Sequence, residues 1–134
     1  MAWPVGTYLQ NLIDQFNQHF QRARIRKQDK DDNRAFVELE GWWRDYRIIV
    51  SEIHRKDGTV RYAYYVFDEN WRKIHGFDNS ADNDALHQKY GPVSTAHLHE
   101  ELPHQHTSDG DICLTEGMDF EGFMGWVQAN LPQP

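Results

Sequence analysis

The chain has 134 residues, a formal net charge of −7 and a single cysteine, Cys113. This length suits one domain that folds around its own core without a metal or a disulfide, and the acidic balance disfavours a protein that binds nucleic acid over its whole surface. One cysteine cannot form an intrachain disulfide, no apolar run is long enough to cross a bilayer and the start shows no leader pattern, so we expect a single cytoplasmic domain over residues 1–134.

The first predicted element is an amphipathic helix over about residues 8–26. Thr7 suits its N-cap, and apolar residues recur every three or four positions within residues 9–20. Basic side chains fill residues 22–27, where they would complement the negative end of the helix dipole. The same cations would also give an acidic chain a local basic surface.

A sheet follows over about residues 35–115, as a meander of five to six short antiparallel strands. The Asp57-Gly58 pair favours a tight hairpin turn, because both central residues of such a turn need positive φ. Residues 60–67 carry aromatic side chains on both faces of a strand, which predicts a central position in the sheet. Residues 78–91 are polar and without periodicity, so they are predicted to form a long loop.

The last predicted element is a helix over about residues 118–130, in which apolar residues again recur at helical spacing. Together with the first helix it would cover one face of the sheet. The fold class expected from the sequence is therefore α+β, an antiparallel meander sheet with an N-terminal and a C-terminal helix.

A dense histidine cluster follows the predicted loop. Four of the eight histidines lie within one stretch of ten residues: His97, His99, His104 and His106. If residues 96–99 and 104–107 pair as two short antiparallel strands, all four imidazoles share one face, with opposed Cβ atoms roughly 4.5–5.5 Å apart. We therefore expect the chemistry of this protein at such a hairpin.

Three interpretations of this cluster are open at the level of sequence. In the first, three or four of the imidazoles bind Zn²⁺ or another divalent metal ion. In the second, a neutral imidazole and an imidazolium act as general base and general acid, the pairing that cleaves RNA through its own 2′-hydroxyl. In the third, the histidines lie on a surface or interface and have no catalytic role. Asp78 and Asn79 are further candidates for the site, because they stand where a strand opens into the long loop.

Several motifs occur in a fixed order in the latter part of the chain. They are Tyr62-Ala63-Tyr64-Tyr65-Val66-Phe67-Asp68, Gly76-Phe77-Asp78-Asn79, His97-Leu98-His99-Glu100, Pro103-His104-Gln105-His106 and a closing Asp119-Phe120. In this order they resemble the TumE-like proteins of bacterial toxin–antitoxin systems, over about residues 60–130. The resemblance implies a small toxin that attacks RNA as a ribonuclease and is neutralised by a cognate antitoxin protein. It also matches six residues to the family pattern: Asp78, Asn79, His97, His99, His104 and His106.

Two other functions compete with a toxin. One is a non-catalytic metal-binding or protein-interaction module, such as an immunity or regulatory protein, that would meet its partner through Trp3, Trp42 and Trp43. The other is a cupin-like metal protein, because residues 91–110 resemble the first cupin metal motif, although the second motif is missing. A homo-oligomer stays open, and we expect no membrane association.

Overall fold

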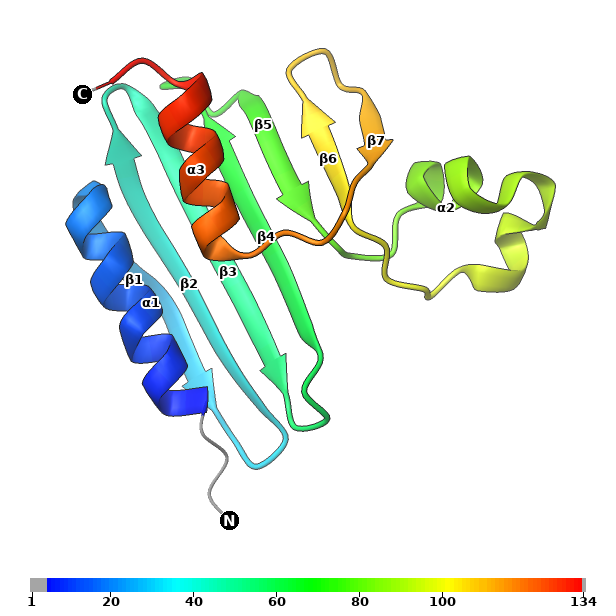
Figure 1. Cartoon of the computed structure of the whole chain (residues 1–134), viewed down its shortest axis with the longest axis horizontal. Helices are drawn as coiled ribbons and strands as arrows, with labels where there is room; N and C mark the ends of the chain where they lie inside the picture. The colour runs from blue at the N-terminus through cyan, green and yellow to red at the C-terminus, as the bar shows by residue number, and fades with distance from the viewer. Residues whose placement is uncertain (1–4, 134) are drawn as a thin grey trace.

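The computed structural model describes residues 5–133, which form one antiparallel sheet of seven strands and three α-helices (Figure 1). The helices are α1 (Val5–His19), α2 (Asn83–Tyr90) and α3 (Phe120–Asn130), with a 3₁₀ helix η1 (Gly91–His97). The strands are β1 (Gln21–Lys30), β2 (Arg34–Trp43), β3 (Tyr46–Arg55), β4 (Val60–Phe67), β5 (Lys73–Asp78), β6 (His104–Thr107) and β7 (Ile112–Leu114). Each strand pairs with the next one along the chain, so the sheet is a meander with β4 at its centre. The predicted α+β class with a helix near each end is confirmed, with one or two strands more than predicted.

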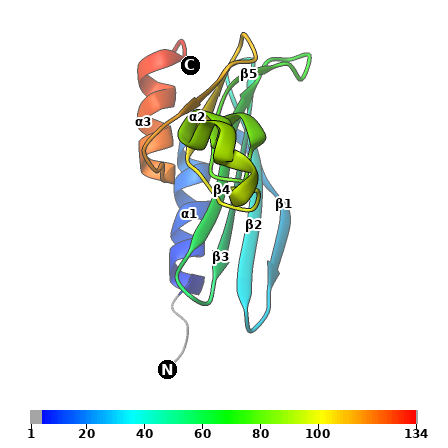
Figure 2. The ribbon, with the colours of Figure 1, turned by 90° about the vertical axis from the view of Figure 1, so that its right-hand side faces the viewer.

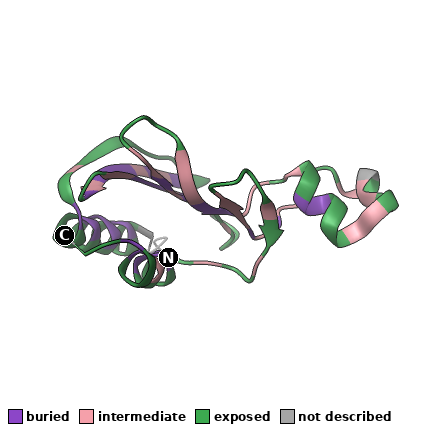
Figure 3. Cartoon of the chain, turned by 90° about the horizontal axis from the view of Figure 1, so that it is seen from above, coloured by how far each residue is buried: buried purple, intermediate pink, exposed green. Residues whose placement is uncertain are grey.

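Both terminal helices lie on the same face of the sheet (Figure 2). They bury their apolar stripes there, and Phe16 of α1 and Phe123 of α3 are completely inaccessible to solvent. The Phe123 ring stacks on Tyr64 of β4 with ring centroids 5.3 Å apart. Burial of one such side chain stabilises the fold by roughly 1.5–3 kcal/mol. Strand side chains alternate, so every second residue of each strand points to the opposite face, here called the open face, which neither helix covers (Figure 3).

The helix predicted over residues 8–26 is wrong in its second half. α1 ends at His19, and residues 21–30 form the edge strand β1, paired with β2. The apolar stripe of the helix ends at Phe20, so a longer helix would have had no further face to bury. Pairing with β2 satisfies the backbone of this basic segment instead. None of the helices within residues 5–133 combines the length and the apolar character needed to cross a membrane.

The histidine hairpin predicted from residues 96–99 and 104–107 is also wrong. β6 lies between β5 and β7 in the sheet, and a strand has only two hydrogen-bonding edges. No edge of β6 is therefore left for residues 96–99. Residues 91–97 form η1 instead, with Gly91 at φ +58° and Pro92 in the first turn.

The long loop predicted over residues 78–91 holds the helix α2. The side chain of Asp82 caps this helix by accepting hydrogen bonds from the backbone N–H groups of Asp84 and Ala85. α2 and η1 form an arm that extends beyond the β7 edge of the sheet (Figures 1 and 3). Because only Ala85 and Leu86 of α2 are buried, the helix has too few apolar residues to show a periodicity in the sequence.

Candidate functional site

Two histidines and one aspartate meet where β5 pairs with β6. Asp78 is opposite His104 in the register and Gly76 is opposite His106, so all three polar side chains point to the open face. Asp78 is 3% exposed and His104 is completely buried. The side chain of His106 keeps 16% of its surface accessible. The strand pairing therefore builds a group of three residues whose ligand atoms lie within 4.8 Å of one another and could hold a metal ion.

The carboxylate of Asp78 is held from several sides. Its Oδ1 accepts hydrogen bonds from the backbone N–H of Ser80 at 3.0 Å and from the Ser80 hydroxyl at 2.7 Å. Its Oδ2 accepts a hydrogen bond from the Tyr65 hydroxyl and lies 2.9 Å from His106 Nε2. Burial by itself raises the pKa of this carboxyl, but the nearby imidazole of His104 and the hydrogen bonds from Tyr65 and Ser80 outweigh it and hold the pKa well below its usual range. Asp78 is therefore an anion at neutral pH.

His104 has its tautomer fixed by the backbone. Nδ1 lies 2.7 Å from the carbonyl oxygen of Leu102, and because a carbonyl only accepts, Nδ1 carries the proton. Nε2 lies 3.0 Å from Asp78 Oδ1, yet its direction misses that oxygen, and within the described residues it makes no aligned hydrogen bond. Burial lowers the pKa of His104, whereas the nearby Asp78 carboxylate and the Leu102 carbonyl raise it, with a net rise. A cation between Nε2 of His104 and the Asp78 carboxylate, either a proton or a metal ion, would therefore be stabilised.

A cavity on the open face reaches Asp78 of this group, and neither histidine is among its lining residues. It has a volume of about 270 Å³ and lies over β3, β4 and the end of β5. It is lined by Ser51, Ile53, Arg61, Tyr62, Ala63, Tyr65, Asp78 and Ser80. Arg61 is exposed and lines the same cavity as Asp78, so the cavity offers a positive charge to an anionic group.

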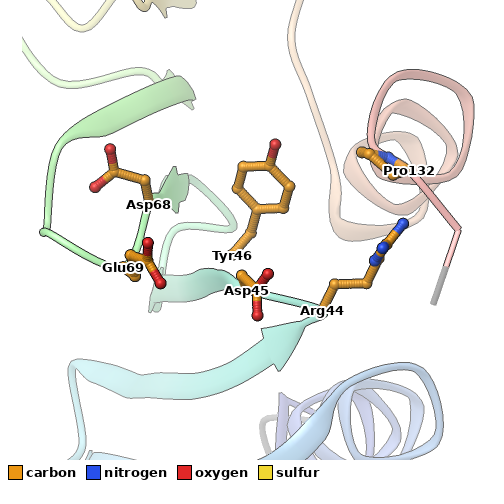
Figure 4. Close-up of a pocket in the computed structure, with 6 residues that line it drawn as sticks. All are labelled: Arg44, Asp45, Tyr46, Asp68, Glu69 and Pro132. Atoms are coloured by element: carbon orange, nitrogen blue, oxygen red, sulfur yellow. The ribbon is translucent and has the colours of Figure 1, made fainter.

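A second hollow, of about 300 Å³, lies elsewhere and is lined by Arg44, Asp45, Tyr46, Asp68, Glu69 and Pro132 (Figure 4). It is as large as the cavity beside Asp78, but it contains no histidine. The Asp68 carboxylate there is occupied by the backbone N–H groups of Asn70 and Arg72. The three carboxylates of this hollow lie in turns between strands. None of the polar side chains that line it is buried. We therefore place the candidate site at Asp78.

The structure separates the four histidines of the predicted quartet. His104 and His106 are in the site, whereas His97 and His99 lie in and just after η1. The His97 ring stacks on Tyr90 with centroids 3.7 Å apart, and His99 is exposed. Within residues 5–133, the group that could hold a metal ion contains only His104 and His106 of the four, because the segment before residue 100 does not pair with β6.

The side chain of Asn79 bonds to the backbone of β4 next to the site. Its side-chain nitrogen donates to the carbonyl of Val60 at 2.8 Å, and its side-chain oxygen accepts from the N–H of Tyr62 at 2.9 Å. The amide thus extends the pairing of β4 with β5 by one step. Asn79 is a positioning residue for Asp78.

Tyr65 is part of the site although the sequence did not single it out. It is opposite Gly76 in the register, and its ring lies directly over this glycine, where a Cβ would collide with it. A glycine two residues before Asp78 is what lets the Tyr65 hydroxyl reach the carboxylate. Aromatic residues on both faces of residues 60–67 were the signal that could have located it.

The three tryptophans of the predicted interaction surface do not lie together on one exposed surface in the part of the chain that the structure describes. Trp43 is buried in the core and its Nε1 donates to the carbonyl of Pro132 at 2.7 Å. Trp42 lies on the open face, half-buried. Trp3 lies outside the described residues.

Comparison of the chain with models of known protein families, with curated proteins and with solved structures found no match. The function proposed below therefore depends on the geometry around Asp78 and on the order of the sequence motifs.

Proposed function

We propose that the protein is a toxin-type effector that cleaves RNA, and that Asp78, His104 and His106 hold one divalent metal ion at its active site. The observation that carries the metal is the buried Nε2 of His104, which lies 3.0 Å from an oxygen of Asp78 and makes no aligned hydrogen bond within the described residues. Two nitrogens and one carboxylate oxygen form a donor set that suits Zn²⁺ and other borderline ions.

The spacing of the three side chains supports this proposal. Metal–ligand bonds of about 2.0–2.1 Å in a tetrahedral site place neighbouring ligand atoms about 3.3 Å apart. The two Nε2 atoms lie 3.0 Å and 2.9 Å from the oxygens of Asp78, so an ion needs the ligands to open by a few tenths of an ångström. The bond from His104 Nδ1 to the Leu102 carbonyl is the kind of outer contact that orients a metal-bound histidine.

A pair of histidines acting as acid and base fits less well. His104 is completely buried, so it can hold an ion from behind but cannot touch a substrate. His97 and His99 lie in another part of the fold. His106 would therefore lack a second histidine to act as its acid or base partner. A metal ion, in contrast, needs to be accessible to substrate from only one side.

The chemistry expected at this site is phosphodiester cleavage. A bound divalent ion supplies a water of lowered pKa and positive charge for the phosphoryl oxygens. Arg61, an exposed residue that lines the cavity, would attract the negatively charged phosphate. Tyr65, which donates to Asp78, would keep the carboxylate turned toward the two histidines.

The toxin role is supported by the motif order that resembles TumE-like proteins. Asp78, His104 and His106 are three of the positions that match that pattern, and they are the three that meet in space. A cognate antitoxin protein is the partner that this role requires, and the cytoplasm is the compartment where both would act.

The proposal is tested by RNA cleavage with matched variants. Wild-type protein with added Zn²⁺ or Mn²⁺ should cleave an RNA oligonucleotide, and His106→Ala should lower the rate by more than about 100-fold, since loss even of an outer contact to a metal ligand costs about 10- to 100-fold. His99→Ala makes the same change at an exposed histidine outside the site and should leave the rate unchanged. Equal rates for the two variants, or no cleavage by the wild type with either metal, would reject the proposal.

A further inference from the structure

A continuous line of aromatic rings and guanidinium groups crosses the open face, from His106 to the edge strand β1. We call it the aromatic–arginine track. Its members are Tyr65, Phe67, Trp71, Arg47, Trp42 and Arg22.

The half of the track next to the candidate site consists of rings. The Tyr65 ring centroid lies 5.9 Å from that of His106 and 6.0 Å from that of Phe67. Phe67 in turn meets Trp71 edge to face at 5.4 Å. Trp71 is 48% exposed, so a large aromatic face is offered to solvent here.

The other half alternates arginine with tryptophan. The guanidinium carbon of Arg47 lies 3.7 Å from the ring centroid of Trp71 and 4.5 Å from that of Trp42. Arg22 follows at 4.6 Å from the Trp42 ring. Such cation–π contacts hold guanidinium planes and rings in fixed positions. The line therefore has no break between His106 and β1.

The sheet register brings these residues together. Phe67 is opposite Arg47, and Arg47 is opposite Trp42, so the three side chains are cross-strand neighbours on one face. Trp71, in the middle of the track, and Arg22, at its β1 end, have φ values of 63° and 51°, in the left-handed region that non-glycine residues rarely adopt. A backbone conformation with this cost is kept at two positions of the track.

The track is positively charged although the protein is acidic. Within residues 5–133, no ion pair involves the four cations of this region: Arg22, Arg47, Arg61 and Lys73. The Lys73 Nζ lies 4.2 Å over the Tyr65 ring. The carboxylates of β2 on the same face, Glu38 and Glu40, form ion pairs with arginines of β1 and do not neutralise these four.

We propose that the aromatic–arginine track binds single-stranded nucleic acid and leads the strand to the site at Asp78. The exposed Trp71 ring and the half-buried rings beside it can stack on unpaired bases, and cations without an ion pair within residues 5–133 can hold the phosphates. Paired bases of a duplex are already stacked and cannot reach a flat sheet, so duplexes bind less well. This inference rests on the proposed function, since it names the class of substrate that would reach the active site.

The test measures binding apart from cleavage. Fluorescence anisotropy with the His106→Ala variant compares labelled oligonucleotides of about 12 nucleotides, within the length that such platforms cover, as single-stranded RNA, single-stranded DNA of the same sequence and duplex. Either single strand should bind at least about 10-fold more tightly than the duplex. Trp71→Ala, at an exposed position that leaves the core intact, should weaken this binding by at least about 5-fold, the loss of one stacked base. Equal binding of single strand and duplex, or no effect of Trp71→Ala, would overturn the inference.

A second pair of variants tests the charge of the track. Arg22→Gln and Arg44→Gln make the same change at two arginines that both have positive φ, but Arg44 bonds to the carbonyl of Gln133 and lies outside the track. Arg22→Gln should reduce the slope of log K against log salt by about 0.7, the value for one phosphate contact on a single strand, and Arg44→Gln should not. Equal slopes for the two variants would contradict the inference. Binding that follows these variants without any RNA cleavage by the wild type would reject only the proposed function.

Discussion

Gly76 is the residue whose replacement tests most directly how the candidate site is built. A Cβ at this position would lie 2.5 Å from Tyr65 Cε1 and closer still to Cδ1, below any separation that real Cβ atoms adopt. In Gly76→Ala the Tyr65 ring must therefore move, and its hydroxyl loses the bond to Asp78. Overpacking costs about 1–3 kcal/mol, and a hydrogen bond to a charged group contributes about 1.5–3 kcal/mol. We expect the two effects together to cost about 2.5–6 kcal/mol in the free energy of unfolding.

Gly76→Ala should stabilise the protein, instead of destabilising it, when the Tyr65 ring is absent. In a Tyr65→Ala background the added methyl group of Gly76→Ala meets no ring, and alanine in a strand is favoured over glycine by about 0.5–1 kcal/mol. Urea unfolding of the wild type, the two single variants and the double variant forms a complete cycle. Effects of Gly76→Ala that agree within about 0.5 kcal/mol in the two backgrounds would refute this account of the site.

Two further predictions concern the core. Phe123→Ala removes a completely buried ring between α3 and the sheet and should cost about 3–5 kcal/mol in urea unfolding, and a cost below about 1 kcal/mol would contradict the packing described. Burial first, and then the Glu52 carboxylate, raise the pKa of Tyr64 far above its ordinary value of 10.0. The unfolded chain therefore loses this proton above about pH 10 while the folded protein keeps it, so the stability present below that pH falls by about 1.4 kcal/mol at pH 11. Tyr64→Phe should therefore lose less stability than the wild type between about pH 9 and 11. An identical loss of stability in both proteins would contradict this prediction.

The elements that the sequence predicted well are those specified by local chemistry. The hairpin at Asp57-Gly58 forms as predicted, although only Gly58, at φ 89°, has the positive φ that was expected of both residues. α3 has its apolar spacing and an N-cap, Asp119, whose side chain accepts from Gly122 N–H. β1 was missed because its basic residues fit a helix end as well as an edge strand, and only pairing with β2 decides between the two.

The candidate site was predicted in part for the same reason. Asp78, His104 and His106 were all named as site residues, but the grouping was wrong. The contact between Asp78 and His106 spans 28 residues of sequence and depends on β5 pairing with β6. No spacing rule within residues 97–106 contains that information. The aromatic pattern of residues 60–67 includes Tyr65, but its place in the site follows from its register position opposite Gly76.

The central claim is that Asp78, His104 and His106 form a site for one divalent metal ion. The most direct measurement is the metal content of untagged protein that has never met a nickel column, after dialysis against Zn²⁺ and then against metal-free buffer. The wild type and the His99→Ala variant should each retain about one ion per chain, and His106→Ala should retain almost none, because it removes one of three ligands. Wild-type protein without bound metal, or equal metal in His106→Ala and His99→Ala, would contradict the account.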